Sequence, residues 1–243
     1  MLMNKPFTVI KIIQETSNVR TLQFKLNEPL EFKPGQFIMI GKDLNIKGET
    51  KKIKRAFSIS SQPSDKDYVE ITVKKEDKGL FTPVIFEQKE NDSLEVSGPF
   101  GQFIYKDNLL NDYENIFLIA GGTGIAPLRS MYNHILTNKI KLNISLLYST
   151  KTPEQIIYRK ELETLKEAHE NFKPTVTITK PEESKEPWDK KKGRISKDLI
   201  NENLNNLEKT VFFICGPPEM VESTVTFLKE LNATNEQIKV EKW

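Results

Sequence analysis

The feature that most constrains the fold of this chain is a change of hydrophobic period between residues 106 and 113. Before this segment, apolar residues recur at every second position or in short runs, which is the pattern of half-buried strands. After it, continuous apolar runs alternate with helical stretches, which is the pattern of a parallel sheet covered by helices. Since 243 residues also exceed what one hydrophobic core usually organises, we predict two domains, at residues 1–107 and 108–243.

Six short strands are predicted in the first half of the chain, separated by turns that contain Asn, Asp, Gly and Pro. We place them at residues 7–15, 19–26, 35–41, 55–61, 67–75 and 92–98. Residues 79–87 have the character of a single turn of helix. Short strands in this arrangement predict an antiparallel barrel or sandwich.

The second half repeats a strand followed by a helix. The predicted strands are at residues 114–120, 142–149, 174–179, 210–215 and 237–243, and the predicted helices at 127–138, 153–170, 196–207 and 217–232. This alternation means βαβ units with right-handed crossovers. We therefore predict a doubly wound parallel sheet with helices on both faces.

Composition limits the chemistry that the chain can carry. Thirty-six Lys and Arg residues balance 34 Asp and Glu residues to a net charge of +2, which argues against a protein built to coat nucleic acid. One Cys and two His residues exclude an intramolecular disulfide, a ligated iron–sulfur cluster and the usual zinc sites. No apolar run reaches the length of a membrane span and the amino terminus has no signal-peptide pattern, so we expect a cytoplasmic protein.

The turn after the first strand of the second half carries glycines where a phosphate site needs them. Residues 120–127 read AGGTGIAP, between an apolar strand and a helix that has Pro127 in its first turn. Glycines let backbone N–H groups approach an anion, and the helix directs its positive end toward the same point. The alternative interpretation is a tight turn without a ligand.

Three further segments are ambiguous when each is taken alone. Residues 215–220, CGPPEM, form another strand-end turn on the same crevice, which brings Cys215 to the site; the alternative is a small buried hydrophobic residue. The strand at residues 55–61, RAFSISS, offers a cation, an aromatic ring and hydroxyls to a phosphate and a flat ring, although an ordinary strand carries the same residues. The loop at residues 79–82, GLFT, could offer N–H groups to a second phosphate.

Taken together and in this order, the segments resemble the ferredoxin–NADP reductase superfamily of flavoproteins. The resemblance extends over almost the whole chain and is carried by RAFSISS at 55–61, PGQF at 34–37, GLFT at 79–82, GPFG at 98–101, GGTGIAP at 121–127, CGPPEM at 215–220 and EKW at 241–243. It implies an FAD-binding Greek-key β-barrel followed by an α/β domain that binds NADPH or NADH. It also implies an enzyme in which hydride passes from the nicotinamide to the flavin.

The resemblance assigns FAD to the barrel. Arg55 would bind the FAD pyrophosphate, Phe57 would lie against the isoalloxazine ring, and Ser58 would hydrogen-bond flavin N5. Phe57 stands where the family usually has Tyr, which removes a hydroxyl and keeps the stacking face. The other residues implied here complete the pyrophosphate site or line the adenosine: Gly79, Thr82, Thr72, Val73 and Lys74.

The same resemblance assigns the nicotinamide dinucleotide to the second domain. Its pyrophosphate would be held by Gly122, Thr123 and Gly124. Cys215 would flank the nicotinamide, and Glu241 would lie near the flavin edge. Trp243, where the family usually has Tyr, would cover the flavin until the nicotinamide displaces it. The implied catalytic group is Ser58, Cys215, Glu241 and Trp243.

The choice between NADPH and NADH falls, by this resemblance, on the residues after the strand at 174–179. Thr179 and Lys180 are similar to the Ser-Arg pair of NADPH users, and a cation with a hydroxyl suits a 2′-phosphate. Carboxylates at Glu182, Glu183 and Glu186 also fit a solvated loop of mixed charge. We predict NADPH, with NADH as the alternative.

The electron acceptor is expected to be a separate redox protein, because the chain lacks ligands for a cluster of its own. The segment from Lys47 to Arg55 carries five cations against Glu49 and is interpreted as a loop that either docks an acidic ferredoxin, flavodoxin or oxygenase component or is simply solvated. Two alternatives stay open: a flavin reductase or diaphorase that reduces small molecules, and an electron-transfer subunit of a larger complex.

Overall fold

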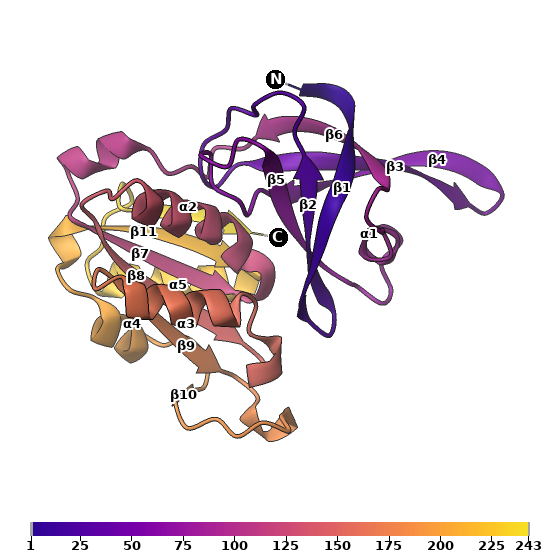
Figure 1. The fold of residues 1–243 in the computed structure, drawn as a ribbon. Helices are drawn as coiled ribbons and strands as arrows, with labels where there is room; N and C mark the ends of the chain where they lie inside the picture. The colour runs from indigo at the N-terminus through magenta and orange to yellow at the C-terminus, as the bar shows by residue number, and fades with distance from the viewer. Residues whose placement is uncertain (1, 243) are drawn as a thin grey trace.

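Six antiparallel strands form the first of two sheets in the computed structural model, which describes residues 2–242 (Figure 1). They are β1 (Leu2–Thr16), β2 (Val19–Lys25), β3 (Phe37–Ile46), β4 (Glu49–Ser58), β5 (Tyr68–Lys74) and β6 (Ser93–Phe100), in the spatial order β4-β3-β6-β1-β2-β5. A bridge between Ile59 and Ile71 connects the two edges, so the sheet curls into a barrel. The short helix α1 (Thr82–Phe86) follows β5, as the sequence predicts.

The barrel core is built from alternate residues of the strands. On β3, Ile38 and Ile40 are fully buried while Phe37 and Met39 are partly exposed. The side chains of Val69, Ile71 and Val73 on β5 are buried in the same cluster as Ile38 and Ile40. This is the period of two that the sequence shows, because successive strand residues point to opposite faces.

The segment from Lys47 to Arg55 is not the predicted loop but a strand of a long hairpin. β4 pairs with β3 from Ile46–Glu49 to Phe37–Ser58, with the turn at Lys47 and Gly48, which both have positive φ angles of 54° and 87°. The sequence prediction is wrong here because residues 49–52 are exposed on both faces, so no apolar alternation marks them. The hairpin extends beyond the barrel (Figure 1).

The second sheet is parallel and has the spatial order β10-β9-β8-β7-β11-β12. Its strands are β7 (Asn115–Gly121), β8 (Asn143–Thr150), β9 (Phe172–Ile178), β10 (Lys191–Lys192), β11 (Thr210–Gly216) and β12 (Ile238–Lys242). The chain starts at β7 and builds outward to β10, then returns to add β11 and β12 on the other side. The order in which the chain adds strands therefore reverses between β7 and β11. In such folds, ligands bind at this reversal point, beyond the carboxyl ends of the strands.

Helices cover both faces of this sheet, so the predicted fold class is confirmed. The helices are α2 (Ile125–Thr137), α3 (Arg159–Ala168), α4 (Lys197–Asn203) and α5 (Pro218–Glu230). Residues of α2 and α3 share one hydrophobic cluster with β7, and residues of α4 and α5 share the cluster on its other face (Figure 1). Within residues 2–242, no helix is long and apolar enough to cross a membrane.

The helix predicted at residues 153–170 begins later than the sequence pattern indicates. A 3₁₀ turn at Pro153–Gln155 is followed by an irregular segment, and α3 starts only at Arg159. Ile156, Ile157 and Tyr158 are all buried, which three consecutive residues on one helix face cannot be. Tyr158 adopts a left-handed conformation with φ of 58°, and this turns the chain into α3.

Candidate functional site

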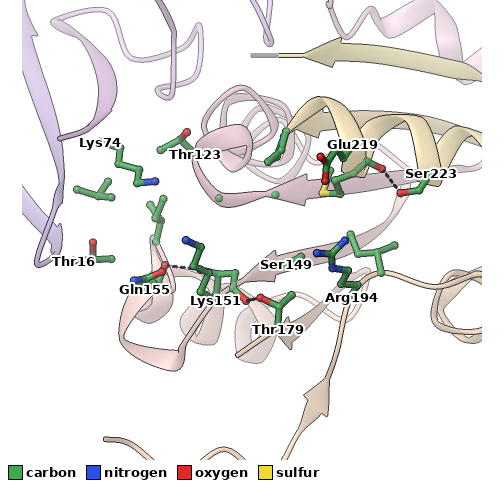
Figure 2. Close-up of a pocket in the computed structure, with 18 of the residues that line it drawn as sticks. Thr16, Lys74, Thr123, Ser149, Lys151, Gln155, Thr179, Arg194, Glu219 and Ser223 are labelled. Atoms are coloured by element: carbon green, nitrogen blue, oxygen red, sulfur yellow. Dashed lines mark hydrogen bonds between the residues drawn. The ribbon is translucent and has the colours of Figure 1, made fainter. Parts of the chain in front are cut away.

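A cavity of about 700 Å³ opens where the carboxyl ends of the parallel strands face the barrel. Its α/β-domain wall comes from the turns after β7, β8, β9 and β11, and its barrel wall comes from the β1–β2 turn and the end of β5. Figure 2 shows Thr16 and Lys74 on the barrel side, across from Thr123 and Ser149. The cavity thus lies at the switch point of the sheet and between the two domains.

The glycine turn after β7 forms one end of this cavity. Gly122 and Thr123 line it, and Gly122 has a positive φ of 54°, which glycine adopts readily. Gly124 lies behind them as the residue that precedes α2. A Cβ atom on Gly124 would lie 2.2 Å from the carbonyl oxygen of Cys215, so only glycine lets α2 begin this close to β11. The predicted residues Gly122 and Thr123 therefore line the cavity, whereas the predicted residue Gly124 does not line it and packs against the backbone of β11.

Three cations reach this cavity from different elements. Lys74 comes from the end of β5, Lys151 follows β8, and Arg194 follows β10. Figure 2 shows Lys74 at the barrel side of the cavity and Arg194 at its far end, within the α/β domain. Lys74 has a carboxylate neighbour in Glu76, at 3.6 Å. Lys151 and Arg194 make no side-chain ion pair with any residue in the range 2–242.

Of the two residues predicted to bind the 2′-phosphate of the adenosine, one lines the cavity and the other does not. Thr179 lines the cavity, and its hydroxyl donates to the Thr150 carbonyl at 3.3 Å. Lys180 does not line the cavity, because its ammonium group pairs with Glu183 on the surface. The cation beside Thr179 in the cavity is instead Arg194. Sequence reasoning missed Arg194 and Lys151, although the run of residues 190–194, KKKGR, marks a basic segment.

Cys215 and Glu241 lie side by side at the ends of adjacent strands. They are register partners on β11 and β12, and the thiol approaches Glu241 Oε2 at 4.0 Å. Cys215 is 1% exposed, and burial, reinforced by the Glu241 charge, raises the pKa of its thiol well above the ordinary value. The thiol therefore stays protonated, which suits a packing or contact role better than nucleophilic chemistry.

Burial raises the pKa of Glu241 from 4.5 to about 7. A carboxyl whose pKa is higher in the folded protein than in the unfolded chain contributes stability that is fully present below the unfolded pKa and is lost as the pH rises through the folded pKa. Between about pH 5 and pH 8, we therefore expect the free energy of unfolding to fall more in the wild type than in Glu241→Gln. The difference between the two proteins should be on the order of 1–2 kcal/mol after allowance for solvent screening.

Urea unfolding at both pH values measures this difference. Glu208→Gln is the matched control, because Glu208 is an exposed carboxylate in the same domain, and it should keep the wild-type pH dependence. Identical pH dependence in the wild type and Glu241→Gln would contradict the assignment of this titration to Glu241.

The predicted flavin residues cluster at the end of β4. Phe57 and Ser58 are half-buried there, and the Phe57 ring is stacked on Phe81 of the loop between β5 and α1, with ring centroids 6.3 Å apart and planes at 28°. Within the described part of the chain the Arg55 guanidinium pairs with no carboxylate and donates to the Lys54 carbonyl at 2.8 Å. An exposed cation, a half-buried aromatic ring and a half-buried hydroxyl thus lie at one strand end, and the ring contacts the loop that precedes α1.

The remaining residues predicted on the FAD side lie in several environments. Val73 is fully buried in the barrel core, so only its backbone can face a ligand. Thr72 is buried at the contact between the domains, and Lys74 lines the cavity beside the glycine turn. Gly79 and Thr82 are close together, since a Cβ on Gly79 would lie 3.1 Å from Thr82 Oγ1. Trp243 lies outside the described residues, so its predicted role as a cover stays a prediction.

Comparison with known proteins identifies both domains. The family described as the oxidoreductase FAD-binding domain matches residues 6–105, and the family described as the oxidoreductase NAD-binding domain matches residues 118–226. The chain is 33% identical over 218 residues to NADH-cytochrome b5 reductase 2 of Candida glabrata, covering 88% of this chain and 71% of that protein.

Two further relatives differ in length and distance. The glycine betaine monooxygenase reductase subunit of Chromohalobacter salexigens is 31% identical over 225 residues, which is 90% of this chain but only 59% of that protein. The cytochrome b5 reductase domain of Ulva prolifera nitrate reductase superposes with a TM-score of 0.86 over 98% of this chain and 97% of that domain, at 23% identity, and so shares the fold.

The two matched families indicate FAD and NAD(P)H as the cofactors, in agreement with the sequence prediction. The residues present fit both groups. The half-exposed aromatic face and unpaired guanidinium at the end of β4 suit a flavin with its pyrophosphate, and the glycine turn with three cations suits a dinucleotide. The fold, the two-domain match and the related reductases together show that this chain belongs to the ferredoxin–NADP reductase superfamily of FAD- and NAD(P)H-dependent oxidoreductases.

Proposed function

We propose that this chain is a reductase that takes hydride from NADPH and passes the electrons one at a time to a separate redox protein. The observation that supports the choice of NADPH is the pair of unpaired cations, Lys151 and Arg194, in the cavity beside Thr179. Cations and hydroxyls bind a 2′-phosphate, whereas NADH sites usually bring a carboxylate to the ribose hydroxyls. Glu219, the one carboxylate among the residues that line this cavity, lies at the start of α5.

On the dinucleotide side, each wall of the cavity has a separate task. The backbone of Gly122 and Thr123, at the start of α2, binds the pyrophosphate, and Lys74 neutralises it from the barrel side. This gives Lys74 a dinucleotide contact in place of the predicted FAD adenosine contact. Arg194 and Thr179 bind the adenosine phosphate at the other end of the cavity.

On the flavin side, Arg55 binds the FAD pyrophosphate, the Phe57 ring orients the isoalloxazine, and the Ser58 hydroxyl donates to its N5 region. When bound, FAD supplies the acceptor atom for hydride and the capacity to release electrons singly. Cys215 and Glu241 lie at the end of the site that receives the nicotinamide. The protonated Cys215 thiol packs against the nicotinamide, and the Glu241 carboxyl, whose pKa is about 7, holds a proton below that pH. The protein thus supplies orientation and exclusion of water.

We propose an acidic ferredoxin, flavodoxin or oxygenase component as the acceptor. Support comes from the β3–β4 hairpin, on which Lys47, Lys51 and Lys52 are exposed. Lys51 and Lys52 pair with Glu49 and Glu95, but exposed pairs of this kind contribute little and can be exchanged for a partner's carboxylates. The cytoplasmic location predicted from the sequence is part of the same proposal.

Anaerobic titration of the purified, FAD-loaded protein tests the proposal. We expect NADPH to bleach the flavin absorbance about 100-fold more efficiently than NADH, because the two cavity cations recognise the extra phosphate. Steady-state rates with a ferredoxin and with free FMN then identify the acceptor. A protein that binds no FAD, or whose flavin neither dinucleotide bleaches, would refute the proposed activity, and faster reduction of free FMN would favour the flavin reductase alternative.

A further inference from the structure

The two domains meet at a buried cluster of polar side chains centred on Arg129 of α2. The Arg129 guanidinium binds both carboxylate oxygens of Glu161 on α3, with three N–O distances between 2.7 and 2.9 Å. Its Nη1 atom also donates to the barrel, to Glu70 Oε2 at 2.6 Å and to the Ser60 carbonyl at 3.1 Å. One guanidinium thus holds two helices of the α/β domain and two segments of the barrel.

Neighbouring contacts extend this cluster. The Ser130 hydroxyl, which is fully buried, donates to the Ser61 carbonyl at 2.6 Å. The Tyr158 hydroxyl hydrogen-bonds the Thr72 hydroxyl of β5, and the Arg129 guanidinium lies 4.6 Å above the Tyr158 ring. The left-handed conformation of Tyr158 brings its side chain to this position, which gives the irregular start of α3 a structural reason.

Burial makes this cluster specific in geometry. The side chains of Arg129 and Glu70 are 14% and 6% exposed. Burial alone would lower the pKa of Arg129, but Tyr158, Glu161 and Glu70 outweigh it, and the pKa lies above its ordinary value. A buried ion pair adds little net stability, yet the planar donor groups of the guanidinium can be satisfied by only one arrangement of partners. The cluster is therefore better suited to fix the relative position of the domains than to stabilise either one.

The cluster also connects the two halves of the candidate site through a single helix. α2 begins directly after the glycine turn that lines the dinucleotide cavity, and Arg129 and Ser130 lie in its second turn. Their acceptors, the carbonyls of Ser60 and Ser61, lie two and three residues after Ser58 at the flavin end of β4. The segment at Ser60 is held from its other side by β5, because the Ser60 N–H donates to the Glu70 carbonyl at 2.9 Å.

We propose that Arg129 is a positioning residue that sets the separation between the dinucleotide turn and the flavin strand, so that the two cofactor rings meet in register for hydride transfer. This inference rests on the proposed function. Hydride transfer is sensitive to displacements of about 1 Å, which can change a rate by roughly 100-fold. Arg129 touches neither predicted ring site and acts through the backbone of residues 60–61.

Arg129→Lys tests the inference, because it keeps the charge and removes the fork of donors. At saturating NADPH we expect the single-turnover rate of flavin bleaching to fall about tenfold, while FAD content and the dissociation constant for NADPH change less than about twofold. The long-wavelength absorbance of stacked nicotinamide and flavin rings should weaken with the rate. Ser130→Ala, which removes a single hydrogen bond, should lower the rate by about threefold.

The matched control is Arg159→Lys on α3. Arg159 forms the same forked pair with Glu186, at 2.6 and 2.9 Å, but this pair is on the surface of the α/β domain. Within residues 2–242, Arg159 makes no hydrogen bond or ion pair with the barrel. Its rate and long-wavelength absorbance should equal those of the wild type. Equal effects in Arg129→Lys and Arg159→Lys, or a rate that falls only in proportion to lost FAD, would overturn the inference. A wild type that binds FAD and is bleached by NADPH in the same experiment separates this failure from failure of the proposed function.

Discussion

Arg194→Ala is expected to lower kcat/KM for NADPH by about 100-fold and to leave kcat/KM for NADH within about twofold. The guanidinium lies in the dinucleotide cavity without an ion-pair or hydrogen-bond partner within residues 2–242, so the substitution breaks no internal polar contact. In the proposed function, it removes a charge-assisted contact that only the 2′-phosphate of NADPH can use. Steady-state kinetics with both dinucleotides and a common electron acceptor measure the ratio.

Lys180→Ala is the informative control for this prediction. Sequence reasoning gives Lys180 the phosphate contact, whereas its ammonium group pairs with Glu183 away from the cavity, so we expect its NADPH preference to equal that of the wild type. A loss of preference in Lys180→Ala but not in Arg194→Ala would reverse the assignment. An equal loss for NADPH and NADH in Arg194→Ala would show that Arg194 binds a group that both dinucleotides share.

Gly124→Ala is expected to lower the thermal midpoint of unfolding by about 10 °C, from a steric cost of about 3 kcal/mol. The backbone of Gly124 has an ordinary φ of −60°, so strain is not the cause. A Cβ atom there would lie 2.2 Å from the Cys215 carbonyl oxygen and 2.8 Å from the Gly216 nitrogen, and backbone atoms of a central strand cannot move away. α2 would have to shift away from β11.

Gly48→Ala separates this clash from the loss of a glycine as such. Gly48 has a positive φ of 87°, but a Cβ atom there meets no atom within 4 Å, and the residue lies in the exposed hairpin turn. Its substitution should cost about 1 kcal/mol from backbone conformation alone. Calorimetry measures the thermal midpoints of the wild type, Gly124→Ala and Gly48→Ala. Equal midpoints for the two variants would contradict close packing of α2 on β11.

The fold could be predicted from sequence because the pattern of buried positions along each strand and helix appears as a pattern of apolar residues in the sequence. β7 and β11 are buried along their whole length and read as unbroken apolar runs, whereas β3 alternates within the barrel. Prediction fails where burial gives no period. The outer part of β4 is exposed on both faces, and residues 156–158 are buried on consecutive positions, so neither the hairpin nor the late start of α3 is visible in the pattern.

In the candidate site, too, residues that are contiguous in sequence could be predicted, whereas residues that meet only in the fold could not. The turn at residues 121–124 is recognisable because strand, glycines and helix are contiguous in sequence. Arg194 and Lys74 reach the cavity from segments 120 residues apart in the chain, and only the folded arrangement shows that they share it. Arg129 reads in the sequence as an ordinary polar position on a helix, because its partners come from β5, α3 and the segment after β4.

The shared Arg129 cluster limits how far this architecture is modular. Each domain has its own hydrophobic cluster, which invites the construction of chimeras that graft a relative's nucleotide-binding half onto this barrel. Such a graft would leave the Glu70 carboxylate without its cationic partner unless the donor helix also brings a guanidinium to the Arg129 position. Recombination between relatives should therefore succeed most often when β5 and α2 are inherited as a matched pair.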